Sequence, residues 1–246
     1  MANTPIVNAG LKYVNGLELA WTADETISMA AGAARDSANS NDIVLSAAVS
    51  ISNATNGANG LDTGTVGANT MYAVYVIGDS TKYQSTAGLL SLASNSEPSL
   101  PAGYDMYRRV GWVLTDGTSD NLLFWQEGMG QVRKYFYDVG ISELSGGSST
   151  TYAAIDLATS VPPIDTTVIL DIAYTPNSAT NNAEFLPYGS SATNGIVRYG
   201  CGVAAVQVGQ IEVPAKLNSS VPTIQYKVDT SDALTLLTVG FYDYMA

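Results

Sequence analysis

The feature that most constrains this chain is a dense run of β-forming residues between two turn signals. Met71-Tyr-Ala-Val-Tyr-Val-Ile77 is rich in tyrosine, valine and isoleucine, which favour a strand. Gly60-Leu-Asp-Thr-Gly64 precedes it and Leu100-Pro-Ala-Gly-Tyr104 follows it, and Gly, Asp and Pro are typical turn residues. This punctuation predicts short strands joined by loops rather than helices.

Similar short runs recur along the whole chain, which is typical of β-sandwiches and barrels. We predict an all-β protein with two antiparallel β-sandwich or jelly-roll-like domains: an N-terminal arm over residues 1–20, a first domain over 21–130 and a second β-rich domain over 131–246. Gly128-Met-Gly130 marks the expected boundary. Strands are expected at residues 21–29, 43–51, 71–77, 107–115, 121–126, 132–139, 152–157, 168–174, 183–186, 196–208, 211–213, 223–228 and 234–242.

Two local expectations concern the region around Trp112 and Trp125. Residues 107–115 and 121–126 flank the loop Asp116-Gly-Thr-Ser-Asp120, a pattern that predicts a β-hairpin. Trp112 and Trp125 would then pack across it. Residues 78–99 are polar, and we expect a loop or a weak edge strand there.

Charge excludes two classes of partner. The chain has 22 acidic and 10 basic residues, a formal net charge of −12. Binding to a phosphate backbone depends on Lys and Arg contacts, so nucleic acid is not expected as a partner. The same field would repel an anionic membrane, and no apolar run approaches the roughly 20 residues of a membrane span.

The single cysteine and the N-terminus indicate how the protein is made. Cys201 cannot form a disulfide within the chain, and a small buried strand residue is its favoured interpretation over a reactive thiol. The first ten residues lack the basic and then apolar pattern of a secretion signal. We therefore expect synthesis in a cytoplasm without export by that route.

The absence of histidine removes Ser-His-Asp and Cys-His mechanisms and the common zinc sites. Paired carboxylates could still serve a glycosidase, and oxygen-rich loops could hold calcium, although no EF-hand spacing occurs. Ordinary turn chemistry is favoured over both, so we expect no cofactor and no enzyme. The carboxylates considered are Asp24, Glu25, Asp36, Asp42, Glu97, Asp116, Asp120, Glu127 and Glu184.

Basic pairs and tyrosines supply the remaining candidate contacts. Arg108-Arg109 and Arg133-Lys134 lie on expected strands, and adjacent strand residues point to opposite faces. Arg108, Arg109 and Arg133 are therefore candidates for buried or intersubunit ion pairs. Tyrosine provides a large contact area with a polar tip, and those nearest to loops are the candidate surface contacts: Tyr83, Tyr104, Tyr188 and Tyr199.

Six blocks follow one another within about residues 20–127: Ile27-Ser-Met-Ala-Ala-Gly-Ala-Ala-Arg-Asp-Ser37, Asn41-Asp-Ile43, Gly60-Leu-Asp-Thr-Gly64, Asn69-Thr-Met-Tyr-Ala-Val-Tyr-Val-Ile77, Leu100-Pro-Ala-Gly-Tyr104 and Tyr107-Arg-Arg-Val-Gly-Trp112. This succession resembles a domain that recurs in tailed-bacteriophage virion proteins of the fibre, tail-fibre and head-decoration type. Residues 131–246 carry no such motif.

The resemblance implies a non-enzymatic virion protein, made in the bacterial host cytoplasm, that forms a homotrimer and contacts major capsid or tail proteins. The chain lacks a shaft, a coiled coil or a collagen-like repeat, which favours a capsid decoration (cement) protein or a short head fibre over a long fibre. The alternative is a tail-fibre receptor-binding module that recognises host surface glycan. A carboxylate-dependent glycan hydrolase is the third hypothesis.

Overall fold

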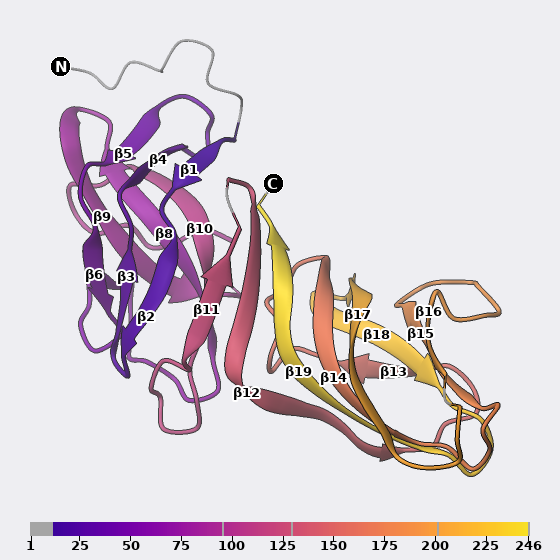
Figure 1. Cartoon of the computed structure of the whole chain (residues 1–246). Helices are drawn as coiled ribbons and strands as arrows, with labels where there is room; N and C mark the ends of the chain where they lie inside the picture. The colour runs from indigo at the N-terminus through magenta and orange to yellow at the C-terminus, as the bar shows by residue number, and fades with distance from the viewer. Residues whose placement is uncertain (1–11, 95, 129, 201, 246) are drawn as a thin grey trace. The chain divides into compact units, whose positions relative to one another are not determined.

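The computed structural model describes residues 12–94, 96–128, 130–200 and 202–245, with the side chains of Tyr83 and Gln84 outside the description. These residues form nineteen strands and no helix (Figure 1), and so no helix that could cross a membrane. The predicted all-β, antiparallel class is confirmed. The chain divides into two compact units: unit 1 contains Met1–Tyr135 and Asp243–Ala246, and unit 2 contains Phe136–Tyr242.

Unit 1 is built from three small sheets, with strand orders β1-β4-β5, β2-β3-β6 and β10-β8-β9-β7. All pairings in them are antiparallel except β7 with β9. The strands of these sheets are β1 (Val14–Gly16), β2 (Leu19–Ala23), β3 (Thr26–Met29), β4 (Gly32–Arg35), β5 (Asp42–Leu45), β6 (Val49–Ser52), β7 (Gly60–Leu61), β8 (Met71–Asp79), β9 (Lys82–Leu92) and β10 (Met106–Leu114). A further strand of unit 1, β11 (Phe124–Glu127), belongs to none of the three.

Strand β8 forms the centre of unit 1, as its composition predicted. Every residue from Met71 to Asp79 is buried, because β9 and β10 pair with its two edges and other strands cover its faces. Gly88 on β9 lets β6 approach closely, since a Cβ at this position would lie 2.2 Å from Cδ1 of Ile51. The core of unit 1 therefore lies between β8–β9 and the two three-stranded sheets.

Two strand predictions in unit 1 were wrong, because residues 21–29 and residues 43–51 each contain two strands rather than one. Residues 78–99, expected to be a loop or a weak edge strand, contain the strand β9, which pairs with β8 over most of its length and buries Ala87, Leu89 and Leu90. Residues 43–51 are two strands rather than one, since β5 joins β4 while β6 joins β3 in another sheet. A continuous apolar run cannot reveal that the chain changes sheets within it.

The predicted hairpin around residues 116–120 is also corrected. An isolated bridge between Thr115 and Asn121 closes the loop, but β11 then leaves β10 and pairs with β12 (Val132–Gly147). The two tryptophans consequently do not pack across a hairpin. Trp112 is buried, whereas Trp125 is 52% exposed.

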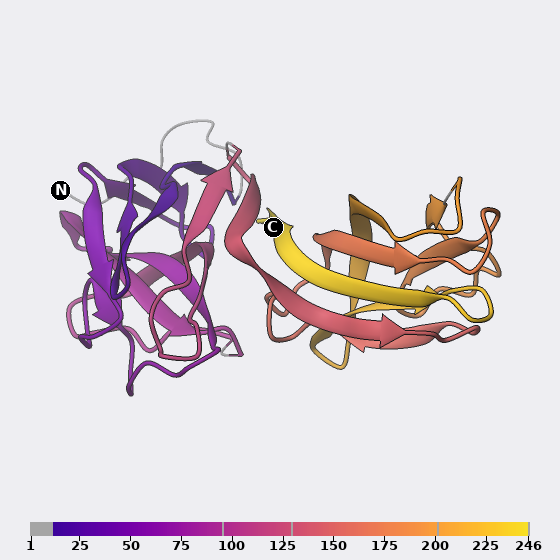
Figure 2. The ribbon, with the colours of Figure 1, turned by 60° about the horizontal axis from the view of Figure 1, so that its bottom comes forward.

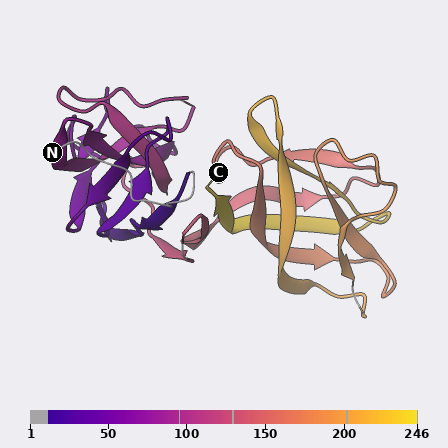
Figure 3. The same ribbon diagram turned by 90° about the horizontal axis from the view of Figure 1, so that it is seen from above.

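Unit 2 is dominated by one large curled sheet (Figures 2 and 3), with the order β12-β19-β14-β17-β18-β15-β16 and with β13 beside β18. The two long strands β12 and β19 have ends that belong to unit 1. The remaining bounds are β13 (Ala153–Asp156), β14 (Thr166–Thr175), β15 (Asn182–Pro187), β16 (Val197–Gly200), β17 (Gln207–Asn218), β18 (Val221–Lys227) and β19 (Ala233–Tyr244).

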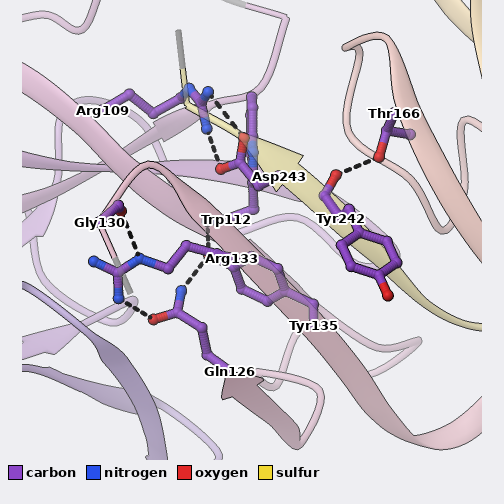
Figure 4. Close-up of polar contacts among 9 residues, drawn as sticks. All are labelled: Arg109, Trp112, Gln126, Gly130, Arg133, Tyr135, Thr166, Tyr242 and Asp243. Atoms are coloured by element: carbon purple, nitrogen blue, oxygen red, sulfur yellow. Dashed lines mark hydrogen bonds and ion pairs between the residues drawn. The ribbon is translucent and has the colours of Figure 1, made fainter. Parts of the chain in front are cut away.

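The core of unit 2 comes from the buried apolar residues of its central strands. On β14, Val168, Leu170 and Tyr174 are fully buried, and the neighbouring strands β17 and β19 pair with β14 in antiparallel register. Thr166 on β14 donates a hydrogen bond from its hydroxyl to the carbonyl oxygen of Tyr242 on the neighbouring strand β19 (Figure 4). The strand expected over residues 196–208 is corrected to β16 and the start of β17, with a connecting segment between them.

Candidate functional site

A groove between β2 and β11 is the candidate site of unit 1. Its volume is about 340 Å³, and it is lined by Leu19, Ala20, Trp21, Leu123, Phe124, Trp125, Gln126 and Glu127. Alternate residues of a strand face opposite sides, so Phe124 and Gln126 point inward while Trp125 and Glu127 are exposed. An open indole and a carboxylate thus stand two residues apart on one face.

Side-chain hydrogen bonds, rather than strand pairing, connect the two walls of the groove. The Trp21 indole Nε1 donates to the carbonyl oxygen of Asn121 at 2.9 Å. The Gln126 Oε1 accepts from the Leu19 backbone N–H at 2.8 Å. Strand β2 pairs only with β3, and β11 only with β12, among the strands described. The groove is therefore a gap between two strand edges held at a fixed spacing.

Arg133 supports the groove from inside. Its side chain is fully buried, and its guanidinium donates to the Gln126 Oε1 at 3.1 Å, to the Gly16 carbonyl at 2.6 Å and to the Gly130 carbonyl at 3.3 Å (Figure 4). The Glu18 carboxylate lies 3.5 Å away. These contacts supply charge-assisted hydrogen bonds, which a buried guanidinium requires.

Tyr135 completes this network below Gln126. Its hydroxyl accepts from the Gln126 amide at 2.5 Å and from the Trp112 backbone N–H at 3.2 Å. Burial raises the pKa of the Tyr135 phenol well above its usual range, with the Asp243 carboxylate adding to the effect. Gly111 makes room for the hydroxyl, because a Cβ there would lie 2.3 Å from it.

Among Arg108, Arg109 and Arg133, Arg109 is the one paired with a fully buried carboxylate. Its Nη1 and Nη2 donate to Asp243 at 2.5 and 3.1 Å, and the Asp243 side chain is fully buried. The guanidinium also lies 4.5 Å from the centroid of the Trp112 ring, within cation–π range. This pair attaches the end of β19 to β10 within unit 1.

Arg108 points to the other face of β10, as strand alternation requires. It is buried and donates to the Lys12 carbonyl at 3.1 Å. Burial lowers the pKa of the Arg108 guanidinium, and the like charge of Arg109 adds to this, while Asp36 opposes it. The structure thus gives Arg108, Arg109 and Arg133 partners within the chain.

The four tyrosines named as surface contacts are not gathered into one site. Tyr104 in unit 1 is half-buried and does not line the groove. In unit 2, Tyr188 is exposed, and Tyr199 packs over Gly209, where a Cβ would lie 2.7 Å from its hydroxyl. The side chain of Tyr83 lies outside the described residues.

Most of the carboxylates considered for catalysis or metal binding serve local structure. Asp116 accepts from the backbone and hydroxyl of Thr118 and from the Asp120 backbone, and the Thr118 hydroxyl is the main cause of its lowered pKa. Asp42 pairs with buried Arg35 at 3.1 Å. Among the described residues, no group of three His, Cys, Asp or Glu is arranged to hold a metal ion.

Glu184 in unit 2 is surrounded by hydrogen-bond donors. Its Oε2 accepts from the Gly195 N–H at 2.6 Å and the Tyr152 hydroxyl at 2.8 Å, and Lys227 Nζ lies at 3.3 Å. Burial raises its pKa, but these donors outweigh burial, so the net shift is downward. Burial, together with Glu184, raises the pKa of Tyr152 to about 12. This cluster stabilises a turn beside β15.

The sequence pattern over residues 121–126 did not predict the groove. Glu127 was considered only as a catalytic carboxylate, and Trp125 only as a packing residue. The signal that could have found the groove is the alternation in Phe124-Trp-Gln-Glu127, which places a tryptophan and a carboxylate on one face. Its opposite wall, β2, lies about a hundred residues earlier and leaves no trace in this local pattern.

Comparison with known proteins gives little further guidance. No family model matches the chain. A stretch of 130 residues, 51% of this chain, is 28% identical to exoglucanase B of Cellulomonas fimi, and it spans 12% of that protein's length. A solved structure of infectious bursal disease virus, Gx strain, aligns over 99% of this chain and 74% of that one, with 11% identity and a TM-score of 0.16. That score is too low to indicate a shared fold.

Proposed function

We propose that this chain is a non-enzymatic structural protein on the surface of a bacteriophage particle, of the capsid-decoration, cement or short head-fibre type, acting as a homotrimer. The observation that supports it most is where the six resembling blocks lie. They fall on β3 to β5, β7, β8 and β10 and the turns between them, all within unit 1. They therefore supply one coherent scaffold rather than scattered matches.

The chemistry of the buried polar groups is consistent with a structural role. Arg109 and Arg133 form hydrogen bonds that join one strand to another, and Glu184 on β15 forms an ion pair with Lys227 on β18. A particle-surface protein without disulfides needs such contacts to remain rigid. Partners under this proposal are further copies of the chain and the major capsid or tail proteins.

Imaging of intact particles tests this proposal. Particles assembled with and without the protein are compared by electron cryo-microscopy, and we expect density of its size at repeated surface positions only when it is present. Particles that are identical in both preparations would reject the structural role.

A second candidate function is glycan recognition at the groove between β2 and β11. The specific observation is the exposed Trp125 ring beside Glu127, because an open aromatic face provides apolar contact area and a carboxylate orients hydroxyl groups. The partial similarity to an exoglucanase agrees with this candidate. In that case the chain would be a receptor-binding module.

A glycan array followed by titration of any positive sugar tests this candidate. Removing an aromatic stacking contact costs about 1 kcal/mol, so W125A should weaken binding roughly fivefold. V139A changes a side chain of similar exposure in unit 2 and should leave binding unchanged. An array with no positive sugar, or equal affinities for W125A and the wild type, would reject glycan recognition at this groove.

A further inference from the structure

The stretch from the residue before β16 to the start of β17 contains the most exposed aliphatic side chains among the described residues. Residues 196–200 and 202–208, called here the apolar segment, include Ile196, Val203, Val206 and Val208, with exposed fractions of 54–76%. Val206 and Val208 lie two residues apart at the start of β17, with half-buried Gln207 between them, so they face the same side of the extended backbone. Single exposed valines are ordinary, but a cluster of the most exposed ones indicates a contact surface.

The charge distribution sets this segment apart from the rest of the chain. From Phe185 to Ile211 the sequence contains no Asp or Glu, the longest such run in a protein with 22 acidic residues. Its one basic residue, Arg198, lies 3.7 Å from Glu184. The apolar segment is thus nearly neutral within a chain of net charge −12.

Strand β16 adds an open sheet edge to this surface. It is the last strand in the order of its sheet and pairs only with β15 among the strands described. Unpaired edges promote pairing with other chains, and monomeric proteins usually protect them with charge or proline. Here the edge contains Val197, Arg198, Tyr199 and Gly200, and the adjoining Gly202 has open space around its Cα.

We infer that the apolar segment is the surface through which copies of this chain associate. The inference rests on the proposed homotrimer and names its contact. Charge favours a second copy over other occupants: two chains of −12 repel each other except where acidic residues are missing, whereas a basic partner would prefer an acidic face. Burial of the valines then provides the attraction.

The test is the mass of the full chain in solution, measured by light scattering after size exclusion. The wild type should have about three times the 25.7 kDa of one chain, and its dissociation constant should fall when NaCl rises from about 0.05 to 0.5 M, because salt screens the repulsion. V206E/V208E removes two apolar contacts and adds charge, so the dissociation constant should rise at least about 100-fold. V139E, at an exposed valine on β12, is the matched control and should keep the wild-type mass.

Three results would overturn the inference. These are a monomeric wild type, a V206E/V208E variant with the wild-type mass, or equal disruption by V139E. If V206E/V208E loses the wild-type circular dichroism spectrum, V206S/V208S is measured in its place and decides the question by the same criterion. Particle imaging is independent of these masses, so the self-contact can fail while the virion role stands.

Discussion

Replacing Arg109 with methionine should destabilise unit 1 by about 3 kcal/mol, because it leaves the buried Asp243 carboxylate without its cation. Methionine retains the apolar stem that covers Trp112, so the loss concerns the guanidinium. The Asp243 side chain is fully buried, whereas that of Arg109 is 21% exposed. We therefore take the lower end of the 3–5 kcal/mol typical of breaking a buried pair.

The asymmetric burial of the pair makes a sharper prediction. D243N leaves a cation that solvent can partly reach and that still lies over the Trp112 ring, so its cost should be smaller, about 1–2 kcal/mol. The double variant R109M/D243N should cost clearly less than the sum of the two single variants, since no charge is left buried. The unequal burial of the two partners is thus the reason why R109M should cost more free energy of unfolding than D243N.

Urea unfolding followed by tryptophan fluorescence measures these costs in the right part of the molecule. Trp21, Trp112 and Trp125 are the three tryptophans of the chain, and all belong to unit 1. K216M is the comparison variant, followed by circular dichroism. The Lys216–Asp165 contact is equally short at 2.6 Å but half exposed at both ends, so its loss should cost about 0–1 kcal/mol.

A cost below about 1 kcal/mol for R109M, or costs that simply add in R109M/D243N, would refute the reasoning. Either result would mean that water screens the pair despite the burial of Asp243. A cost for D243N above that for R109M would contradict the argument from unequal exposure.

Four further outcomes are expected. R133K should destabilise unit 1 by about 3 kcal/mol in the same urea assay, because one ammonium cannot satisfy the several buried acceptors around the guanidinium. G88A should cost about 1–3 kcal/mol in thermal unfolding, because its Cβ collides with Ile51 in the core. The lowered pKa of the Glu184 carboxyl stabilises the fold above about pH 4.5, and this contribution is lost as pH falls through the folded-state pKa. E184Q removes the ionisable group, so the free energy of unfolding should fall less steeply at acid pH. Burial raises the pKa of the Glu143 carboxyl, so the wild type should lose stability as pH rises from about 4.5 through that pKa. E143Q should not show this loss. A curve of stability against pH identical to that of the wild type would contradict the prediction for either carboxylate variant.

Local composition was enough to predict the all-β class and many strand positions. Tyrosine and valine in β8, and similar runs in β14 and β19, favour extended backbone whatever their neighbours are. Turn residues end these runs because their backbone preferences are intrinsic. The alternation rule also correctly separated Arg108 from Arg109 on opposite faces of β10.

Strand pairing was beyond local patterns. Strand β9 extends for eleven residues because β8 pairs with it, and β11 pairs with β12 rather than with its expected partner β10. The most informative site residues have the same origin: Gln126 reaches Leu19, and Arg109 reaches Asp243, across more than a hundred residues of chain.

The sequence by itself determined that this chain forms β-strands, carries a net charge of −12 and leaves residues 185–211 free of acidic side chains, because propensity and charge are properties of individual residues. Only the tertiary structure decided which strand edges stay unpaired, that Trp112 is buried and Trp125 exposed, and that Asp243 pairs with Arg109. Those outcomes depend on which distant strands meet, and burial and ion pairing exist only once they have met.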